Sequence, residues 1–71
     1  MAEAAYDRGN ALEHKGDADG AMKDHNYAIR LKQDYATAFN NRGIARRTRG
    51  DVEAGQRDCK EAVRLGYQPA N

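Results

Sequence analysis

The chain has 71 residues, with 12 lysine and arginine residues against 11 aspartate and glutamate residues, for a formal net charge of +1. A chain of this length supports one small domain with a thin core, and so small a net charge does not favour a general polyanion binder. No apolar run reaches the roughly 20 residues that a bilayer span needs, and the single cysteine, Cys59, excludes an internal disulfide. We therefore expect a soluble, cytoplasmic protein without a membrane segment.

The spacing of apolar residues predicts a helical hairpin in the first half of the chain. The first helix runs from about residue 3 to residue 15, with Ala5, Gly9 and Leu12 on one face. Gly16 and Asp17 then provide a break and a helix N-cap. The second helix carries an apolar stripe that continues to Leu31 and should pack on the first helix: Ala18, Ala21, Met22, His25, Ala28 and Ile29.

The second half of the chain restates this pattern after a short polar segment at 32–35. Phe39, Gly43 and Ala45 begin a third helix, and Gly50 with Asp51 repeats the turn. The stripe of the fourth helix consists of Val52, Gly55, Cys59, Ala62 and Val63. We expect larger side chains to fill the gaps between helices: Leu12, Leu31, Phe39 and Leu65. Gly66 followed by Pro69 predicts a helix stop, because glycine suits the left-handed C′ position and proline cannot continue a helix.

The two halves repeat each other with a period of 34 residues. When residues 2–35 are aligned with 36–69, the identical pairs include Ala4/Ala38, Arg8/Arg42, Gly9/Gly43, Ala11/Ala45, Gly16/Gly50, Asp17/Asp51, Asp24/Asp58 and Ala28/Ala62. A fixed period of this length is typical of stacked-repeat proteins, in which each unit buries its apolar face against a neighbour. The pattern therefore predicts binding rather than catalysis.

The period, the small residues at Gly9 and Gly43, the Gly-Asp turns and the alanines Ala28 and Ala62 resemble the tetratricopeptide repeat (TPR) family over almost the whole chain. The resemblance implies an all-α fold in which two helix-turn-helix hairpins stack as a short right-handed superhelical α-solenoid. A single domain would then span 1–71, with one repeat at 2–35, a second at 36–69 and a tail at 70–71. The chain departs from the family pattern at Ala5, Arg46 and Gly55. Because glycine inside a helix costs about 1 kcal/mol relative to alanine, we expect the second repeat to be the looser one.

The resemblance also implies a protein or peptide partner, bound without a cofactor along a concave face formed by the first helix of each repeat. That groove would be lined by Glu3, Tyr6, Asn10, Glu13, His14, Thr37, Asn40, Asn41, Ile44, Arg47 and Thr48. Asn10 and Asn41 match asparagines of the subgroup that clamps the C-terminal carboxylate of chaperones. The clamp is incomplete, because Tyr6 stands where that subgroup has lysine, so ordinary surface hydrogen bonds are the preferred interpretation of both asparagines.

An arginine cluster in the second half offers an alternative site. Arg42, Arg46 and Arg49 are spaced to share one helix face, which suits an anionic ligand. Nucleic acid is disfavoured, because the basic excess is modest and no aromatic residue interleaves with the arginines. The alternative interpretation is a solvated face, in which Arg42 and Arg46 are partly covered by the first repeat and reach carboxylates at its rim.

Enzyme and metal signatures are absent from the sequence, so we expect no catalytic residue, no cofactor and no metal site. His14 and His25 are too few and too scattered for a metal centre. His25 and Cys59 occupy equivalent repeat positions, and equivalent points on packed helices lie about 8–10 Å apart, too far to share one ion. We interpret His25 as a semi-buried packing residue and Cys59 as a small hydrophobic residue in its stripe.

Stacked repeats generally need polar terminal units and at least three repeats, whereas this chain carries two. We therefore expect part of the last helix to lie open for self-association: Cys59, Ala62, Val63 and Leu65. The alternative function is then a structural self-assembly unit, or an engineered minimal repeat, that completes its core by homo-oligomerisation. Pairing of the last helices in a two-fold homodimer is the favoured arrangement, and head-to-tail stacking is the other.

Overall fold

The structure is a computed structural model that describes residues 1–68, and these residues form four α-helices and no strand. The helices are α1 (Ala2–His14), α2 (Ala18–Leu31), α3 (Ala36–Thr48) and α4 (Val52–Arg64). The prediction of an all-helical chain with four helices is confirmed for this part of the chain. Pro69, the second half of the predicted helix stop, and the predicted tail at 70–71 lie outside the described residues.

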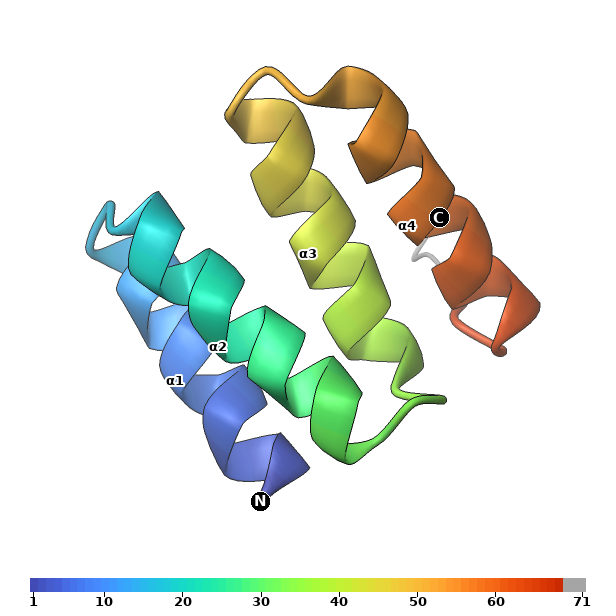
Figure 1. Ribbon diagram of the computed structural model, residues 1–71, viewed down its shortest axis with the longest axis horizontal. Coiled ribbons are helices and arrows are strands. Elements are labelled where there is room, and N and C mark those ends of the chain that lie inside the picture. Colours follow the sequence, from blue (N-terminus) through green and yellow to red (C-terminus); the bar gives the residue numbers. More distant parts are fainter. Residues whose placement is uncertain (69–71) are drawn as a thin grey trace.

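The helices form two antiparallel hairpins that lie side by side (Figure 1). α1 packs on α2, α3 packs on α4, and the hairpins meet chiefly through α2 and α3. The Cα positions extend over 28 × 27 × 23 Å. α1 and α4 therefore lie on opposite sides of the α2–α3 pair, as Figure 1 shows.

Each hairpin turn is made by the predicted Gly-Asp pair. Gly16 and Gly50 have φ angles of 87° and 96°, in the left-handed region that favours glycine. The amide of Gly16 donates to the carbonyl of Glu13 (3.0 Å) and that of Asp17 to the carbonyl of Leu12 (2.8 Å), which is the Schellman pattern that closes a helix. The Asp17 carboxylate then accepts from the amide of Gly20 at 2.9 Å and opens α2.

The same closing hydrogen bonds end α3 and α4 in the second hairpin. The amides of Gly50 and Asp51 donate to the carbonyls of Arg47 and Arg46, and the Asp51 carboxylate accepts from the amide of Ala54 at 3.4 Å. Gly66, with a φ of 106°, closes α4 in the same way, so its predicted C′ position is confirmed. One dipeptide thus ends one helix and begins the next, which explains why both halves form the same hairpin.

The core is built from small side chains. All the buried hydrophobic residues of the described chain except Met22 are alanines: Ala2, Ala5, Ala21, Ala28, Ala38, Ala45, Ala54 and Ala62. Tyr6, Ile29 and Tyr35 pack around the cluster of Ala5, Ala28 and Ala38 and join the two hairpins. The prediction that Leu31 fills the core is wrong: its side chain, at the end of α2, is 48% exposed, because alanine and glycine make the close helix contacts.

The helices α3 and α4 approach each other backbone to backbone at Gly43 and Gly55. A Cβ atom on Gly43 would lie 2.7 Å from the carbonyl oxygen of Gly55, and a Cβ atom on Gly55 would lie 2.6 Å from the carbonyl oxygen of Gly43. Real Cβ atoms essentially never come this close to backbone oxygen. Gly55 therefore allows the close contact between α3 and α4, a role that its low helix propensity does not reveal.

Candidate binding face

The hairpins are joined on the α1–α3 side by a polar link. The Asn41 side-chain amide donates to the Asn10 carbonyl oxygen at 2.6 Å and lies 3.2 Å from the Tyr6 hydroxyl. All three side chains are partly buried, and the Tyr6 ring also packs on Tyr35 with ring centroids 5.2 Å apart. The structure thus brings together three of the predicted groove residues. Asn10 and Asn41 bond to each other in the contact between the hairpins, a more buried position than the surface hydrogen bonds that the sequence favours.

An open depression of about 450 Å³ lies beside this link, where α3 turns into α4. It is lined by Ile44, Arg47, Thr48 and Val52. Ile44 is 46% exposed and Val52 is 49% exposed, so the depression offers aliphatic surface next to the Arg47 guanidinium. Val52 was expected in the buried stripe of α4. Its exposure corrects that assignment: Val52 is the first residue of α4, directly after the Asp51 cap, and it lies at the edge of the stripe.

A second depression, of about 290 Å³, separates the ends of the two hairpins and shares Thr48 with the first. Its lining includes Glu13, Ala18 and Ala45. The Glu13 carboxylate accepts a hydrogen bond from His25 Nε2 at 2.6 Å, so it is tied to α2 rather than free in the groove. The predicted binding face is therefore hollowed at two neighbouring places.

His25 is more deeply buried than the semi-buried position that we expected. Its side chain has no exposed surface, and its ring lies 5.9 Å from that of Tyr6. Within residues 1–68, Nδ1 has no hydrogen-bond partner. This nitrogen lies against Gly9, where an added Cβ atom would approach it to 3.0 Å. The histidine therefore fills the space that the missing glycine side chain leaves between α1 and α2.

Three other predicted groove residues lie outside the polar link and outside both depressions. His14 is exposed at the end of α1, whereas Thr37 and Asn40 are partly buried on α3. Thr37 lies close enough to the Tyr35 hydroxyl to hydrogen-bond with it, so it belongs to the contact around Tyr35 rather than to an open groove. The structure thus concentrates the predicted groove in two places, the Tyr6–Asn10–Asn41 link and the depression at Ile44 and Arg47.

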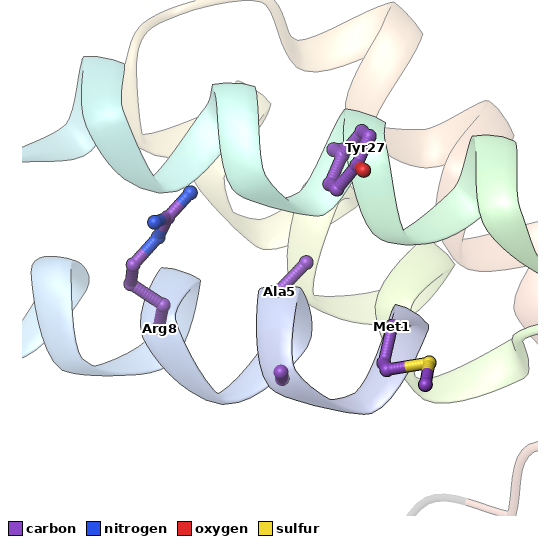
Figure 2. A pocket seen from close by; sticks show the side chains of 5 residues that line it. Met1, Ala5, Arg8 and Tyr27 are labelled. Carbon is purple, nitrogen blue, oxygen red and sulfur yellow. The ribbon is translucent and has the colours of Figure 1, made fainter.

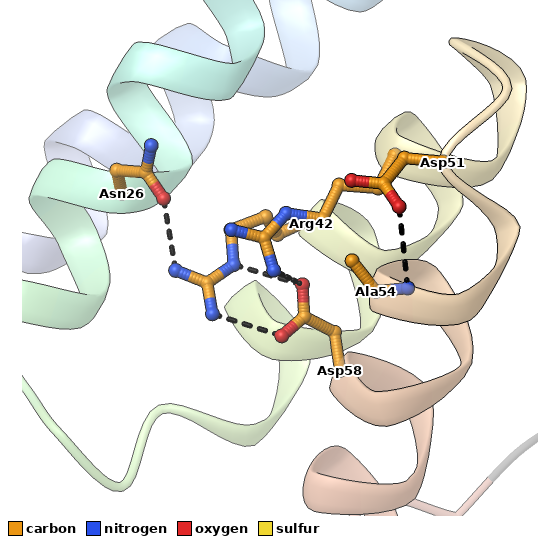
Figure 3. A network of polar contacts seen from close by, with 6 residues as sticks. Asn26, Arg42, Asp51, Ala54 and Asp58 are labelled. Carbon is orange, nitrogen blue, oxygen red and sulfur yellow. Dashed lines mark hydrogen bonds and ion pairs between the residues drawn. The ribbon is translucent and has the colours of Figure 1, made fainter.

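The strongest polar network lies on the other side of α3, around Asp58 (Figure 3). The buried Asp58 carboxylate accepts from Arg42 Nε at 2.9 Å and Arg42 Nη2 at 2.8 Å, and from Arg46 Nη1 at 2.9 Å. Arg42 Nη1 also donates to Asn26 Oδ1 of α2 at 2.8 Å, which ties the second hairpin to the first. Sequence reasoning missed this network, although Asp24/Asp58 and Arg8/Arg42 repeat together and so pointed to a shared contact.

This network changes the interpretation of the arginine cluster. Arg42 and Arg46 share the Asp58 carboxylate, and Arg49 pairs with Asp19 at 3.2 Å. The arginines therefore do reach carboxylates, but the main one is buried in their own hairpin rather than at the rim of the first. All three side chains pair with carboxylates of the chain itself, which favours the interpretation without an anionic ligand.

The first hairpin carries the equivalent pair between Arg8 and Asp24. Arg8 Nε and Nη2 donate to the two Asp24 oxygens at 2.8 and 2.7 Å. Leu12 occupies the position equivalent to Arg46, so within residues 1–68 Asp24 receives one guanidinium, that of Arg8. Hydrogen bonding from Arg8 holds the pKa of Asp24 below its ordinary value of 3.8.

We predict from this shift that acid weakens the fold. A carboxyl group whose pKa is lowered by folding contributes stability above its unfolded pKa and loses that contribution as the pH falls through the folded value. The free energy of unfolding should therefore decrease as the pH falls from about 5 to below 3.8, the ordinary pKa of this carboxyl group. Urea titrations followed by circular dichroism measure this decrease, and the variant Asp24→Asn should show a smaller one. Equal decreases in both proteins would contradict the assignment.

The self-association face that the sequence predicts is only partly present. Ala62 is fully buried against the rest of its hairpin, so its inclusion was wrong. Cys59 and Leu65 are partly buried, and the Cys59 sulfur lies where a Cβ atom on Gly43 would approach it to 2.8 Å, so it faces α3. Only Val63, 56% exposed, presents a large apolar surface.

Neither the protein-family models nor the curated protein sequences contain a match to this chain. Within residues 1–68, no three or more His, Cys, Asp or Glu side chains are placed to hold a metal ion. None of the helices in that part of the chain combines the length and apolar character needed to cross a membrane. The candidate function therefore rests on the surfaces described above.

Proposed function

We propose that the chain is a tetratricopeptide-repeat protein whose hairpins stack as a short right-handed α-solenoid, and that it binds a segment of a partner protein without chemistry of its own. Three observations support this proposal. The halves repeat with a period of 34 residues. Both halves form hairpins with the same Gly-Asp turn. The second helix of the first hairpin packs on the first helix of the next.

The observation that carries the binding function is the depression at Ile44, Arg47 and Val52. Two half-exposed aliphatic side chains beside an exposed guanidinium suit a partner segment with an apolar residue close to a carboxylate. Among the described residues, no carboxylate pairs with Arg47 in a salt bridge that we identify. The binding partner supplies that carboxylate, and its apolar side chain covers Ile44 and Val52.

A displayed library of random peptides tests the proposal. Peptides selected on the wild-type chain should share an apolar residue within a few positions of an acidic one. Binding of a selected peptide, measured by calorimetry, should weaken by about tenfold or more in Arg47→Glu, because a charge-assisted hydrogen bond is replaced by repulsion. Ile44→Asp should have a similar effect, because it places a charge in the apolar part of the site.

Arg57→Glu is the matched control, because it makes the same charge reversal at an exposed position of α4 outside the depression. Its peptide affinity should change little. If Arg57→Glu weakens binding as much as Arg47→Glu, the chain attracts acidic peptides through its overall charge. If Ile44→Asp binds like the wild type, the peptide lies elsewhere.

A further inference from the structure

The contact between α2 and α3 is an internal example of how one hairpin docks on the next. On α3, Ala38 and Ala45 are 0% and 4% exposed. Arg42 donates to Asn26 at 2.8 Å and Arg49 pairs with Asp19 at 3.2 Å, so polar pairs flank the apolar contact. The 34-residue period assigns each of these positions a counterpart on α1 or α4.

The outer face of α1 repeats the chemistry of the docked face of α3. Ala4, Arg8 and Ala11 are identical to their counterparts on α3, and Lys15 keeps the positive charge of Arg49. All four residues are exposed. The contrast is clearest for the arginines, because the Arg42 side chain is 16% exposed under α2, whereas the Arg8 side chain is 70% exposed. α1 thus presents a docking face that nothing within residues 1–68 covers.

A depression on this face marks the place for an apolar side chain. It measures about 290 Å³ and is lined by residues that include Met1, Ala4, Arg8 and Tyr27 (Figure 2). In the internal contact, the counterparts of Met1 and Ala4 are Tyr35 and Ala38, and Ile29 of α2 packs against the same alanine cluster, which includes Ala38, as Tyr35 does. The counterpart of Ile29 is Val63.

The outer face of α4 supplies the matching half. Val63, at the position of Ile29, is 56% exposed. Glu53 keeps the negative charge of Asp19 and is exposed. Gln56 replaces the buried Met22 and is the least similar of these positions.

We propose that α4 of one chain docks on α1 of a second copy, in the register that α2 and α3 use within the chain. Val63 then enters the depression at Met1 and Ala4, and Glu53 pairs with Lys15 of the second copy as Asp19 pairs with Arg49. Because α1 and α4 lie on opposite sides of the molecule, the contact joins two different faces, so each added copy leaves a further α1 or α4 face for the next copy. The product is an open head-to-tail array, not a two-fold dimer.

One pair opposes this assembly and makes it testable. Lys60 stands at the position of Asn26, so it faces Arg8 of the second copy where Asn26 accepts a hydrogen bond from Arg42. Like charges there weaken the contact. The exposed Lys60→Asn variant restores the internal pair without touching the core.

Light-scattering mass, measured with reductant up to the millimolar range, is the first test. The wild-type mass should rise with concentration and pass that of a dimer. Lys60→Asn should reach the same mass at about tenfold lower concentration, because a repulsive pair becomes a hydrogen bond to a charged group. A monomer mass for Lys60→Asn throughout this range would overturn the proposal.

Two blocked variants, both made with Lys60→Asn, distinguish the head-to-tail array from the two-fold dimer. Ala11→Glu blocks the α1 face and Val63→Lys blocks the α4 face, and both positions are exposed, so circular dichroism should show folded chains. Each variant alone should stay monomeric, whereas an equal mixture should form a 1:1 dimer through the two unblocked faces. Dimerisation of Ala11→Glu alone, or a monomeric mixture, would overturn the proposed register.

Discussion

Replacing Asp58 by asparagine should lower the free energy of unfolding by about 3 kcal/mol, because removing one partner of a buried ion pair leaves the remaining charge uncompensated. Asp58 receives three hydrogen bonds from Arg42 and Arg46, whose side chains are only 16% and 30% exposed. A neutral amide can accept from one guanidinium but cannot balance two. The alanine core offers little apolar area to offset this loss.

Asp24→Asn is the matched control, since Asp24 has the same position in the first hairpin and is equally buried. Among the described residues its one guanidinium partner is Arg8, whose side chain is 70% exposed and can be hydrated again. We expect a loss of about 1–2 kcal/mol there.

Urea denaturation followed by circular dichroism at neutral pH measures both losses. If Asp58→Asn is already unfolded in buffer, the two variants should be compared in trimethylamine N-oxide, which favours the compact state. Equal losses in the two variants would show that Arg46 adds nothing to the network.

Gly55→Ala should destabilise the protein by about 2 kcal/mol, the cost of overpacking a well-packed contact. Helix propensity alone predicts the opposite sign, because alanine is favoured over glycine by about 1 kcal/mol inside a helix. The geometry decides between them. The new methyl group would lie 2.6 Å from the Gly43 carbonyl oxygen and would also contact Arg47, so α3 and α4 must move apart.

The exposed substitution Ala11→Gly measures helix propensity without a packing change. It should cost about 1 kcal/mol. Gly55→Ala, if governed by propensity, would stabilise the protein by a similar amount in the same urea titration. A gain of stability would mean that the helices separate at little cost, and that the second hairpin is as loose as the sequence alone predicts.

The helices and turns could be predicted from the sequence because their causes are local. Gly16-Asp17 and Gly50-Asp51 provide the left-handed residue and the cap within two positions, and the structure confirms both. The Asp58 network could not be predicted in the same way, because its contacts join residues 12 and 16 positions apart. The joint repetition of Arg8/Asp24 and Arg42/Asp58 was the available signal.

The candidate site was predicted less well than the fold. Periodicity assigned Val52 and Val63 to the same stripe as Ala62, yet both valines are about half exposed and Ala62 is fully buried. A helix that packs through alanine and glycine buries only a narrow face, so residues at the edge of an apolar stripe remain accessible. Residue type alone does not distinguish the centre of such a stripe from its edge.

The alanine-rich core also affects how stability varies with temperature. Exposure of apolar surface raises the heat capacity on unfolding, and exposure of polar surface lowers it. Here the buried surface is divided between small methyl groups and polar side chains such as Asp24, His25 and Asp58. We therefore expect a small heat-capacity change of unfolding for a chain of this length. The free energy of unfolding then varies little with temperature on either side of its maximum.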